Sequence, residues 1–131
     1  MANKVAWISD ITTQKKPWGE VSPWNSVGHS CNKILKINKG HRTSLKKYSI
    51  KDETFYLLSG RLLVVYGDDR SIDISDMNTG ELLEGQVLTV PSGCPYRLEA
   101  IVDSVIIESS NNNQSEVEII EDDYSRRQKN I

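Results

Sequence analysis

The sequence predicts a single all-β domain, folded as a barrel or a sandwich. Between residues 33 and 110, short apolar or alternating runs follow one another, and turn residues separate them. No part of this range has a sustained helical period. Many short strands at even spacing are typical of β-sandwiches and closed barrels. A length of 131 residues suffices for one hydrophobic core and is too short for two.

The expected elements divide the chain into three parts. Residues 1–30 contain four prolines and glycines and few periodic apolar positions, which predicts an irregular N-terminal arm that wraps another surface. Residues 31–110 form the barrel core. Within residues 111–131 we expect a polar loop, one more strand at 117–120 and a charged tail on the surface. The strands expected in the core are residues 33–38, 43–48, 54–59, 61–67, 71–75, 86–90, 96–100 and 104–109.

Composition and charge exclude several classes of function. The 16 basic and 18 acidic residues leave a net charge of -2, whereas a nucleic-acid-binding domain usually has a clear basic excess. No apolar run approaches the roughly 20 residues that span a bilayer. The first residues, MANKVAWISD, lack the apolar stretch of a secretory signal. We therefore expect a cytoplasmic protein that binds neither nucleic acid nor membranes, with Cys31 and Cys94 as reduced thiols.

Glycine, proline and polar residues recur at fixed distances in the core. From Gly40 to Gly60 the chain reads G-x5-K-x-Y-x4-E-x6-G, and from Gly85 to Tyr96 it reads G-x5-P-x-G-x2-Y. Over about sixty residues, these spacings resemble the two cupin motifs, G-x5-H-x-H-x4-E-x6-G and G-x5-P-x-G-x2-H. The resemblance implies a cupin double-stranded β-helix, a jelly-roll barrel, with an irregular N-terminal arm.

Further segments resemble one cupin family along most of the chain. The sequence contains KPWG, NKILKINKG, TSLKKY and EDDYSRR in this order. The C-terminal domain of bacterial type II mannose-6-phosphate isomerases, often fused to a mannose-1-phosphate guanylyltransferase, has PWG, a V-K strand, L-S-L-Q-x-H and D-D-Y-G-R in the same order. The match covers roughly residues 16–127 and implies common descent more strongly than common activity.

The sequence departs from this family at the metal-ligand positions. Lys46 and Tyr48 stand where the first motif of the family has glutamine and histidine, and Tyr96 stands at the histidine of the second. Only Glu53 is retained. A lysine ammonium has no lone pair to donate and repels a cation. We therefore expect no metal and no other cofactor.

Alternation along the strands predicts what fills the site instead. Side chains two apart share a face of a strand, so the motif alignment places Lys46 and Tyr48 in the barrel interior. A buried lysine and a buried glutamate are tolerable when paired. We expect Lys46 to pair with Glu53 directly, or through one water or one tyrosine hydroxyl. The expected interior positions are Lys33, Leu35, Ile37, Ser44, Lys46, Tyr48, Glu53, Phe55, Leu57, Tyr96, Leu98 and Ala100.

Several of these features also have a purely structural interpretation. The Lys46–Glu53 pair either plugs an old cavity or binds a ligand. The two tyrosines either fill space left by histidines or contact a ligand. Cys94 has no basic neighbour in sequence, which favours a passive thiol. Further alternatives concern Trp18 and Trp24 as core anchors or a sugar platform, Arg42, Lys46, Lys47 and Lys51 as a largely solvated face, and His29 and His41 as loop residues or metal ligands.

Two classes of function follow. In the first, the protein binds a sugar phosphate or nucleotide sugar in carbohydrate or polysaccharide metabolism; as an enzyme it would be a metal-free isomerase with Glu53 as the catalytic base. In the second, it is a non-catalytic cupin that acts through protein contacts, as a homodimer or beside a transferase. The expected substrate-binding residues are Lys33, Lys46, Tyr48, Tyr96 and Arg126. Arg126 matches a family arginine thought to reach the substrate, although Ser125 replaces the glycine before it.

Overall fold

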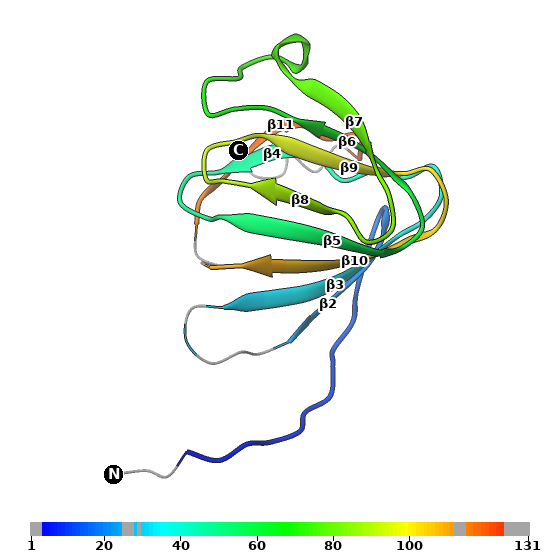
Figure 1. Cartoon of the computed structure of the whole chain (residues 1–131), viewed down its shortest axis with the longest axis vertical. Coiled ribbons are helices and arrows are strands. Elements are labelled where there is room, and N and C mark those ends of the chain that lie inside the picture. The colour runs from blue at the N-terminus through cyan, green and yellow to red at the C-terminus, as the bar shows by residue number, and fades with distance from the viewer. Residues whose placement is uncertain (1–3, 25–27, 29, 112–114, 125–131) are drawn as a thin grey trace.

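The computed structural model describes residues 4–24, 28, 30–111 and 115–124, whose regular secondary structure consists of β-strands and one short 3-10 turn (Figure 1). Their strands form two antiparallel sheets of a jelly-roll barrel, in the orders β1-β2-β3-β10-β5-β8 and β11-β4-β9-β6-β7. No helix in these ranges is long and apolar enough to cross a membrane. The strands are β1 (Gln14–Lys16), β2 (Gly19–Trp24), β3 (Cys31–Ile37), β4 (Leu45–Tyr48), β5 (Glu53–Ser59), β6 (Leu62–Tyr66), β7 (Asn78–Leu82), β8 (Val87–Val90), β9 (Tyr96–Ala100), β10 (Ser104–Ser110) and β11 (Val117–Glu121).

Strands that carry the two motifs lie in opposite sheets. β4 pairs with β9 and β11 in the second sheet, whereas β5 pairs with β10 and β8 in the first. The first motif therefore places Lys46 and Tyr48 on one wall of the barrel and Glu53 on the other. The register of β10 brings Glu108 opposite both Phe55 of β5 and Lys33 of β3.

The interior faces follow the predicted alternation. Leu35 and Ile37 of β3, Phe55 and Leu57 of β5, and Leu98 and Ala100 of β9 are all buried and belong to one hydrophobic core. On the same faces, nearer the strand ends, polar and charged side chains replace the apolar ones. The predicted interior positions of these three strands are confirmed.

Part of the predicted N-terminal arm forms strands. Residues 4–13 have no regular structure, but β1 and β2 extend the first sheet beside β3. Gly19 makes this pairing possible, because its φ of 153° suits glycine and a Cβ there would collide with the Lys36 carbonyl oxygen of β3. The alternation in this short segment was hidden by Pro17, Gly19 and Pro23.

The prediction of a strand at residues 71–75 is wrong. A 3-10 turn (Ile74–Asp76) stands there, and the strand that pairs with β6 is β7, further along the chain. Local hydrogen bonds explain the difference: Asp76 accepts from the Asp73 amide at 3.2 Å, and Ser71 donates to Asp68 at 3.4 Å. Such side-chain bonds compete with a sheet ladder.

The C-terminal segment is held against the barrel. β11 pairs with β4, which confirms the strand expected at 117–120. Arg97, almost fully buried on the outer side of β9, donates to Asp123 at 3.3 Å and to the Thr43 carbonyl oxygen at 2.8 Å. The Tyr124 hydroxyl lies 2.9 Å from Nδ1 of His41. The described part of the expected charged tail therefore lies on the surface of the barrel and is fastened to it through Asp123 and Tyr124.

Candidate functional site

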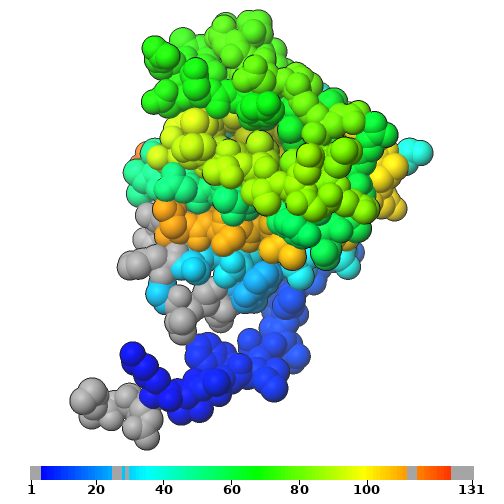
Figure 2. Space-filling view, in the orientation of Figure 1, coloured from blue at the N-terminus to red at the C-terminus, as the bar shows by residue number. Residues whose placement is uncertain are grey.

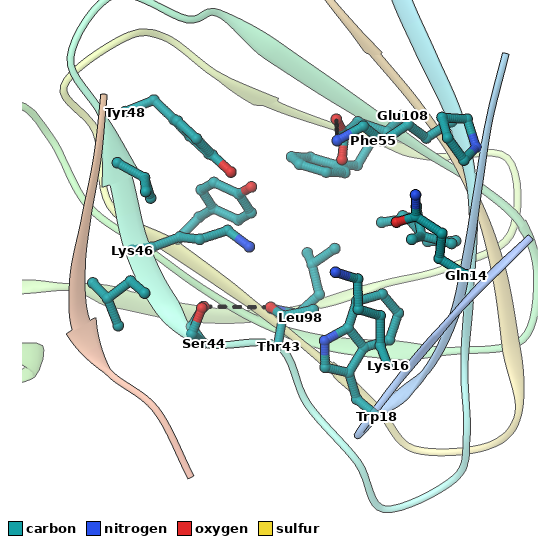
Figure 3. Close-up of a pocket in the computed structure, with 17 residues that line it drawn as sticks. Gln14, Lys16, Trp18, Thr43, Ser44, Lys46, Tyr48, Phe55, Leu98 and Glu108 are labelled. Atoms are coloured by element: carbon teal, nitrogen blue, oxygen red, sulfur yellow. Dashed lines mark hydrogen bonds and ion pairs between the residues drawn. The ribbon is translucent and has the colours of Figure 1, made fainter. Parts of the chain in front are cut away.

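A cavity of about 510 Å³ lies between the two sheets and opens beside β1 and β2 (Figure 3). Its volume lies within the range of small-molecule sites. Lys46 and Tyr48 of β4 point into it from one side, and Gln14 and Lys16 from the other. The cavity is lined by Gln14, Lys16, Trp18, Val21, Pro23, Lys33, Leu35, Thr43, Ser44, Lys46, Tyr48, Phe55, Tyr96, Leu98, Glu108, Val117 and Ile119.

The structure brings together most of the predicted site residues. Lys33, Lys46, Tyr48 and Tyr96 all line the cavity. Glu53 is buried behind it and borders a second, smaller cavity of about 300 Å³. Arg126, like His29, lies outside the described residues.

Lys51, rather than Lys46, pairs with Glu53. The Lys51 ammonium lies 3.4 Å from Oε2 of Glu53 and 3.8 Å from Oε2 of Glu108. All three side chains are more than nine-tenths buried. The expected direct Lys46–Glu53 pair is therefore wrong, and so is the expectation that Lys51 belongs to a solvated face.

Sequence reasoning missed this arrangement, although each residue carried a signal. Lys51 precedes Glu53 by two positions, so in an extended segment the two side chains share a face. Glu108 occupies an inward position of β10, two residues after the buried Ile106. What alternation could not supply was the register that places Glu108 beside Lys33, 3.9 Å apart.

Lys46 lies in the cavity without an acidic partner. It makes no hydrogen bond or ion pair with the residues that the structure describes, and its ammonium lies 5.7 Å from the centre of the Tyr96 ring. Burial lowers the pKa of Lys46 to about 8, because the charged form loses hydration, and the more distant Glu53 and Glu108 offset this only in part.

The pKa of Glu53 is shifted in the opposite direction, upward. Burial, and then repulsion from Glu108, raises the pKa of Glu53, while Lys51 acts against the shift. The Tyr96 hydroxyl lies near the carboxylate, yet neither carboxylate oxygen of Glu53 has a partner with hydrogen-bond geometry in the described residues. Glu53 is thus held by charge and not by a hydrogen-bond network.

The two tyrosines remain neutral over the physiological range. Burial raises the pKa of Tyr96 far above its ordinary value and also raises the pKa of Tyr48, and nearby Glu53 and Glu108 add to both shifts. The Tyr48 ring lies under the Lys51 ammonium at 4.4 Å, a favourable cation–π distance. Both phenols are therefore hydrogen-bond donors at the edge of the cavity.

The donor set does not fit a divalent metal. Three of the positions that hold metal ligands in cupins carry Lys46, Tyr48 and Tyr96, and the remaining one, Glu53, already neutralises Lys51. Within the described ranges, no group of three histidine, cysteine, aspartate or glutamate side chains is placed to hold a metal. Ammonium groups repel a cation and protonated phenols are poor ligands.

His41 and Cys94 lie outside the cavity lining and make packing contacts. The His41 ring stacks on Tyr124 with a centroid distance of 6.2 Å and contacts its hydroxyl through Nδ1. Cys94 packs against the core, and burial together with Asp69 and Asp68 raises the pKa of its thiol. A raised thiol pKa disfavours the thiolate, in agreement with a passive role.

Known structures share this architecture. Capsular polysaccharide assembling protein CapF from Staphylococcus aureus superposes with a TM-score of 0.73 at 16% identity, over 86% of this chain and 35% of that one. Oxalate decarboxylase from Bacillus subtilis gives a TM-score of 0.75 at 14% identity, over 91% and 33%. Procruciferin, the 11S globulin from Brassica napus, gives 0.67 at 19%, over 82% and 29%.

These neighbours are cupin-fold proteins. The chain has the cupin fold. At identities of 14–19%, the similarity to these proteins concerns the fold alone. The matched part of this chain spans about a third of the length of each neighbour. No protein-family model and no curated protein sequence matches the chain. The predicted jelly-roll barrel is confirmed, whereas the closer resemblance to mannose-6-phosphate isomerases rests on the sequence motifs.

Proposed function

We propose that this cupin binds a phosphorylated sugar, either a sugar phosphate or a nucleotide sugar, in the cavity between its sheets. The observation that carries the proposal is the excess of cations around that cavity. Lys16, Lys33 and Lys46 line it, while Glu108 is the only acidic residue among its described lining. Because Glu108 is shared between Lys33 and Lys51, its single charge does not neutralise all three lysines of the cavity.

The placement of the lysines suits a phosphate group. Lys33 and Lys46 come from opposite sheets, and Lys16 extends toward the cavity from β1 (Figure 3). Ammonium groups bind phosphate as mobile point charges with up to three donors each. Lys46 forms no internal ion pair that a phosphate would need to break.

The remaining lining suits a sugar. Trp18 and Phe55 offer aromatic surface, and Ser44, Tyr48 and Tyr96 offer hydroxyl groups. Sites for small molecules combine apolar walls with a few such polar groups. The name of the neighbour CapF, a capsular polysaccharide assembling protein, supports carbohydrate as the class of ligand, as do the isomerase-like motifs of the sequence.

Catalysis is a further step that the proposal does not require. As a general base, Glu53 would need to reach the substrate, but its carboxylate lies behind the cavity lining and is ion-paired with Lys51. Tyr96, which lines the cavity and whose hydroxyl lies near the Glu53 carboxylate, is the group through which Glu53 would act. We therefore propose that Lys33, Lys46, Tyr48 and Tyr96 bind the ligand, and this proposal assigns them no catalytic role.

A thermal-shift screen tests the proposal. Mannose 6-phosphate, fructose 6-phosphate and GDP-mannose are each added to the purified protein, with mannose and inorganic phosphate as controls. A ligand at one hundred times its Kd stabilises the folded state by about 2.7 kcal/mol. We expect at least one phosphosugar to raise the Tm in wild type and in Lys47→Met, but much less in Lys46→Met. Lys47 is the matched control because it lies on the same strand and pairs with Glu118 at 3.9 Å.

A specific observation favours the second class of function, action through protein contacts. Residues 4–13 extend away from the barrel (Figures 1 and 2), and Val5, Trp7, Ile8 and Ile11 are exposed, Ile8 completely. We propose on this ground that the arm packs on another chain in a homodimer. Light scattering of wild type against Trp7→Ser/Ile8→Ser tests it: a dimer that becomes a monomer supports the contact, and a monomeric wild type contradicts it.

A further inference from the structure

Lys46 differs from the other lysines of the barrel in its surroundings. Lys33 and Lys51 each lie within 4 Å of the Glu108 carboxylate, whereas Lys46 has neither an ion pair nor a hydrogen bond among the described residues. Its side chain is half-buried, and Figure 3 shows its amine directed into the cavity. A free amine in a ligand-sized cavity is positioned to react as well as to attract an anion.

We propose that Lys46 is a nucleophile that captures a carbonyl-bearing ligand as a reversible imine. The Lys46 Nζ lone pair attacks the carbonyl carbon, the C=O π bond breaks, and the oxygen takes up a proton as the nitrogen loses one. The resulting carbinolamine then expels its hydroxyl group, with a second proton, as water. The net change is amine plus carbonyl to imine plus water, and no further reactant is needed. The inference rests on the proposed function and adds that the sugar is bound with a free aldehyde or ketone.

Burial of the Lys46 side chain favours the reactive, unprotonated amine. Its pKa is lowered to about 8: burial has the largest effect and lowers it, Glu53 and Glu108 raise it in part, and Lys33 and Lys51 lower it. At pH 7.5, a pKa near 8 leaves roughly two hundred times more free amine than an ordinary lysine has. Lysines that form Schiff bases are activated by such desolvation and by cationic neighbours.

Hydrogen-bond donors for the leaving oxygen lie near the amine. The Tyr96 ring is 5.7 Å from Lys46 Nζ, and in Figure 3 the Tyr48 hydroxyl and the Lys46 amine point into the same part of the cavity. Both phenols keep their protons because burial raises their pKa values. A neutral hydroxyl can donate a hydrogen bond to the oxygen of the carbinolamine while that oxygen takes up its proton from solvent.

Reductive trapping tests the nucleophile in the unmodified full chain. The protein is incubated at pH 7.5 with glycolaldehyde and sodium cyanoborohydride, and the alkylated lysines are located by peptide mass mapping. We expect Lys46 to be labelled at least about tenfold faster than Lys47. Lys46→Met should lose this adduct and Lys47→Met should keep it. Equal labelling of Lys46 and Lys47, or labelling that follows surface exposure alone, would overturn the proposal, and this site-resolved comparison in wild type does not depend on the folding of a variant.

Two phosphorylated compounds distinguish the imine proposal from the proposal that the cavity binds a phosphosugar. Mannose 6-phosphate has a masked aldehyde, while mannitol 6-phosphate has the same phosphate and no carbonyl group. Trapping of mannose 6-phosphate on Lys46 together with a thermal shift by both compounds supports both proposals. A shift by mannitol 6-phosphate with no adduct on Lys46 from either aldehyde contradicts the imine and leaves the binding proposal intact. Trapping of glycolaldehyde on Lys46, with neither phosphosugar bound, supports the nucleophile and contradicts the proposed ligand.

Discussion

Replacing Lys51 by methionine removes the cation that two buried carboxylates share. At 3.4 Å from Glu53 and 3.8 Å from Glu108, the ammonium gains about 9 kcal/mol of attraction at an effective dielectric constant of about 20. The variant also avoids the desolvation of the ammonium, which offsets several kcal/mol of that loss. The methionine chain keeps the apolar packing of the lysine stem. We therefore expect Lys51→Met to lower the free energy of unfolding by about 3–5 kcal/mol at pH 7.

Urea denaturation of wild type, Lys51→Met and Lys47→Met measures this loss. Lys47 pairs with the exposed Glu118 at 3.9 Å, and its replacement should cost at most about 1 kcal/mol. The penalty of Lys51→Met should shrink as the pH falls, because protons bind the stranded carboxylates in the folded state more tightly than in the unfolded state. A loss no larger than that of Lys47→Met, or one that does not change with pH, would refute the buried ion cluster.

Four further results are expected. The folded pKa of Lys46, about 8 against an ordinary 10.5, makes the unfolded state bind more protons between these values, so the stability of wild type relative to Lys46→Met should rise with pH across this window; because the same shift makes the buried ammonium unfavourable at pH 7, Lys46→Met should be at least as stable as wild type there. Gly19→Ala should cost at least about 2 kcal/mol in urea denaturation, because its Cβ meets the Lys36 carbonyl oxygen at a positive φ. Elemental analysis after incubation with zinc, manganese or nickel and dialysis should find no stoichiometric metal; one metal per chain that is lost on mutating Glu53 would contradict this. A coupled assay should find no efficient interconversion of mannose 6-phosphate and fructose 6-phosphate, since a single lysine replaces a metal term worth several kcal/mol; turnover abolished by both Lys46→Ala and Glu53→Gln would disprove it.

The core of the fold could be predicted because its signals are local. Glycines and a proline at fixed spacing mark the two cupin motifs, and period-two alternation places Phe55, Leu57 and Leu98 inside. Elements whose signal depends on partners were missed. β2 contains a glycine and a proline but is held by pairing with β3. The run at residues 71–75 has a strand-like pattern, which is overridden by local hydrogen bonds that the backbone amides of Ile72 and Asp73 donate to the Asp76 carboxylate.

The sequence predicts which residues form the site better than it predicts which of them form ion pairs. Lys33, Lys46, Tyr48 and Tyr96 line the cavity as alternation and the motifs predict. The spacing of Lys51 and Glu53 shows that they can share a face, but which lysine meets Glu53 also depends on the path of the loop between β4 and β5 and on the register of β10. Charge balance within the barrel is therefore a tertiary property, and the sequence pattern alone assigned it to the wrong lysine.

A crystal structure with bound mannose 6-phosphate tests the central claim, that the lysines of the cavity bind a phosphosugar. We predict that the phosphate lies within hydrogen-bond distance of at least two of the ammonium groups of Lys16, Lys33 and Lys46, with the sugar ring against Trp18 or Phe55. Lys51 should remain paired with the two glutamates, as in the free protein. A phosphosugar bound outside this cavity, or a cavity that stays filled only by water at saturating ligand, would contradict the account.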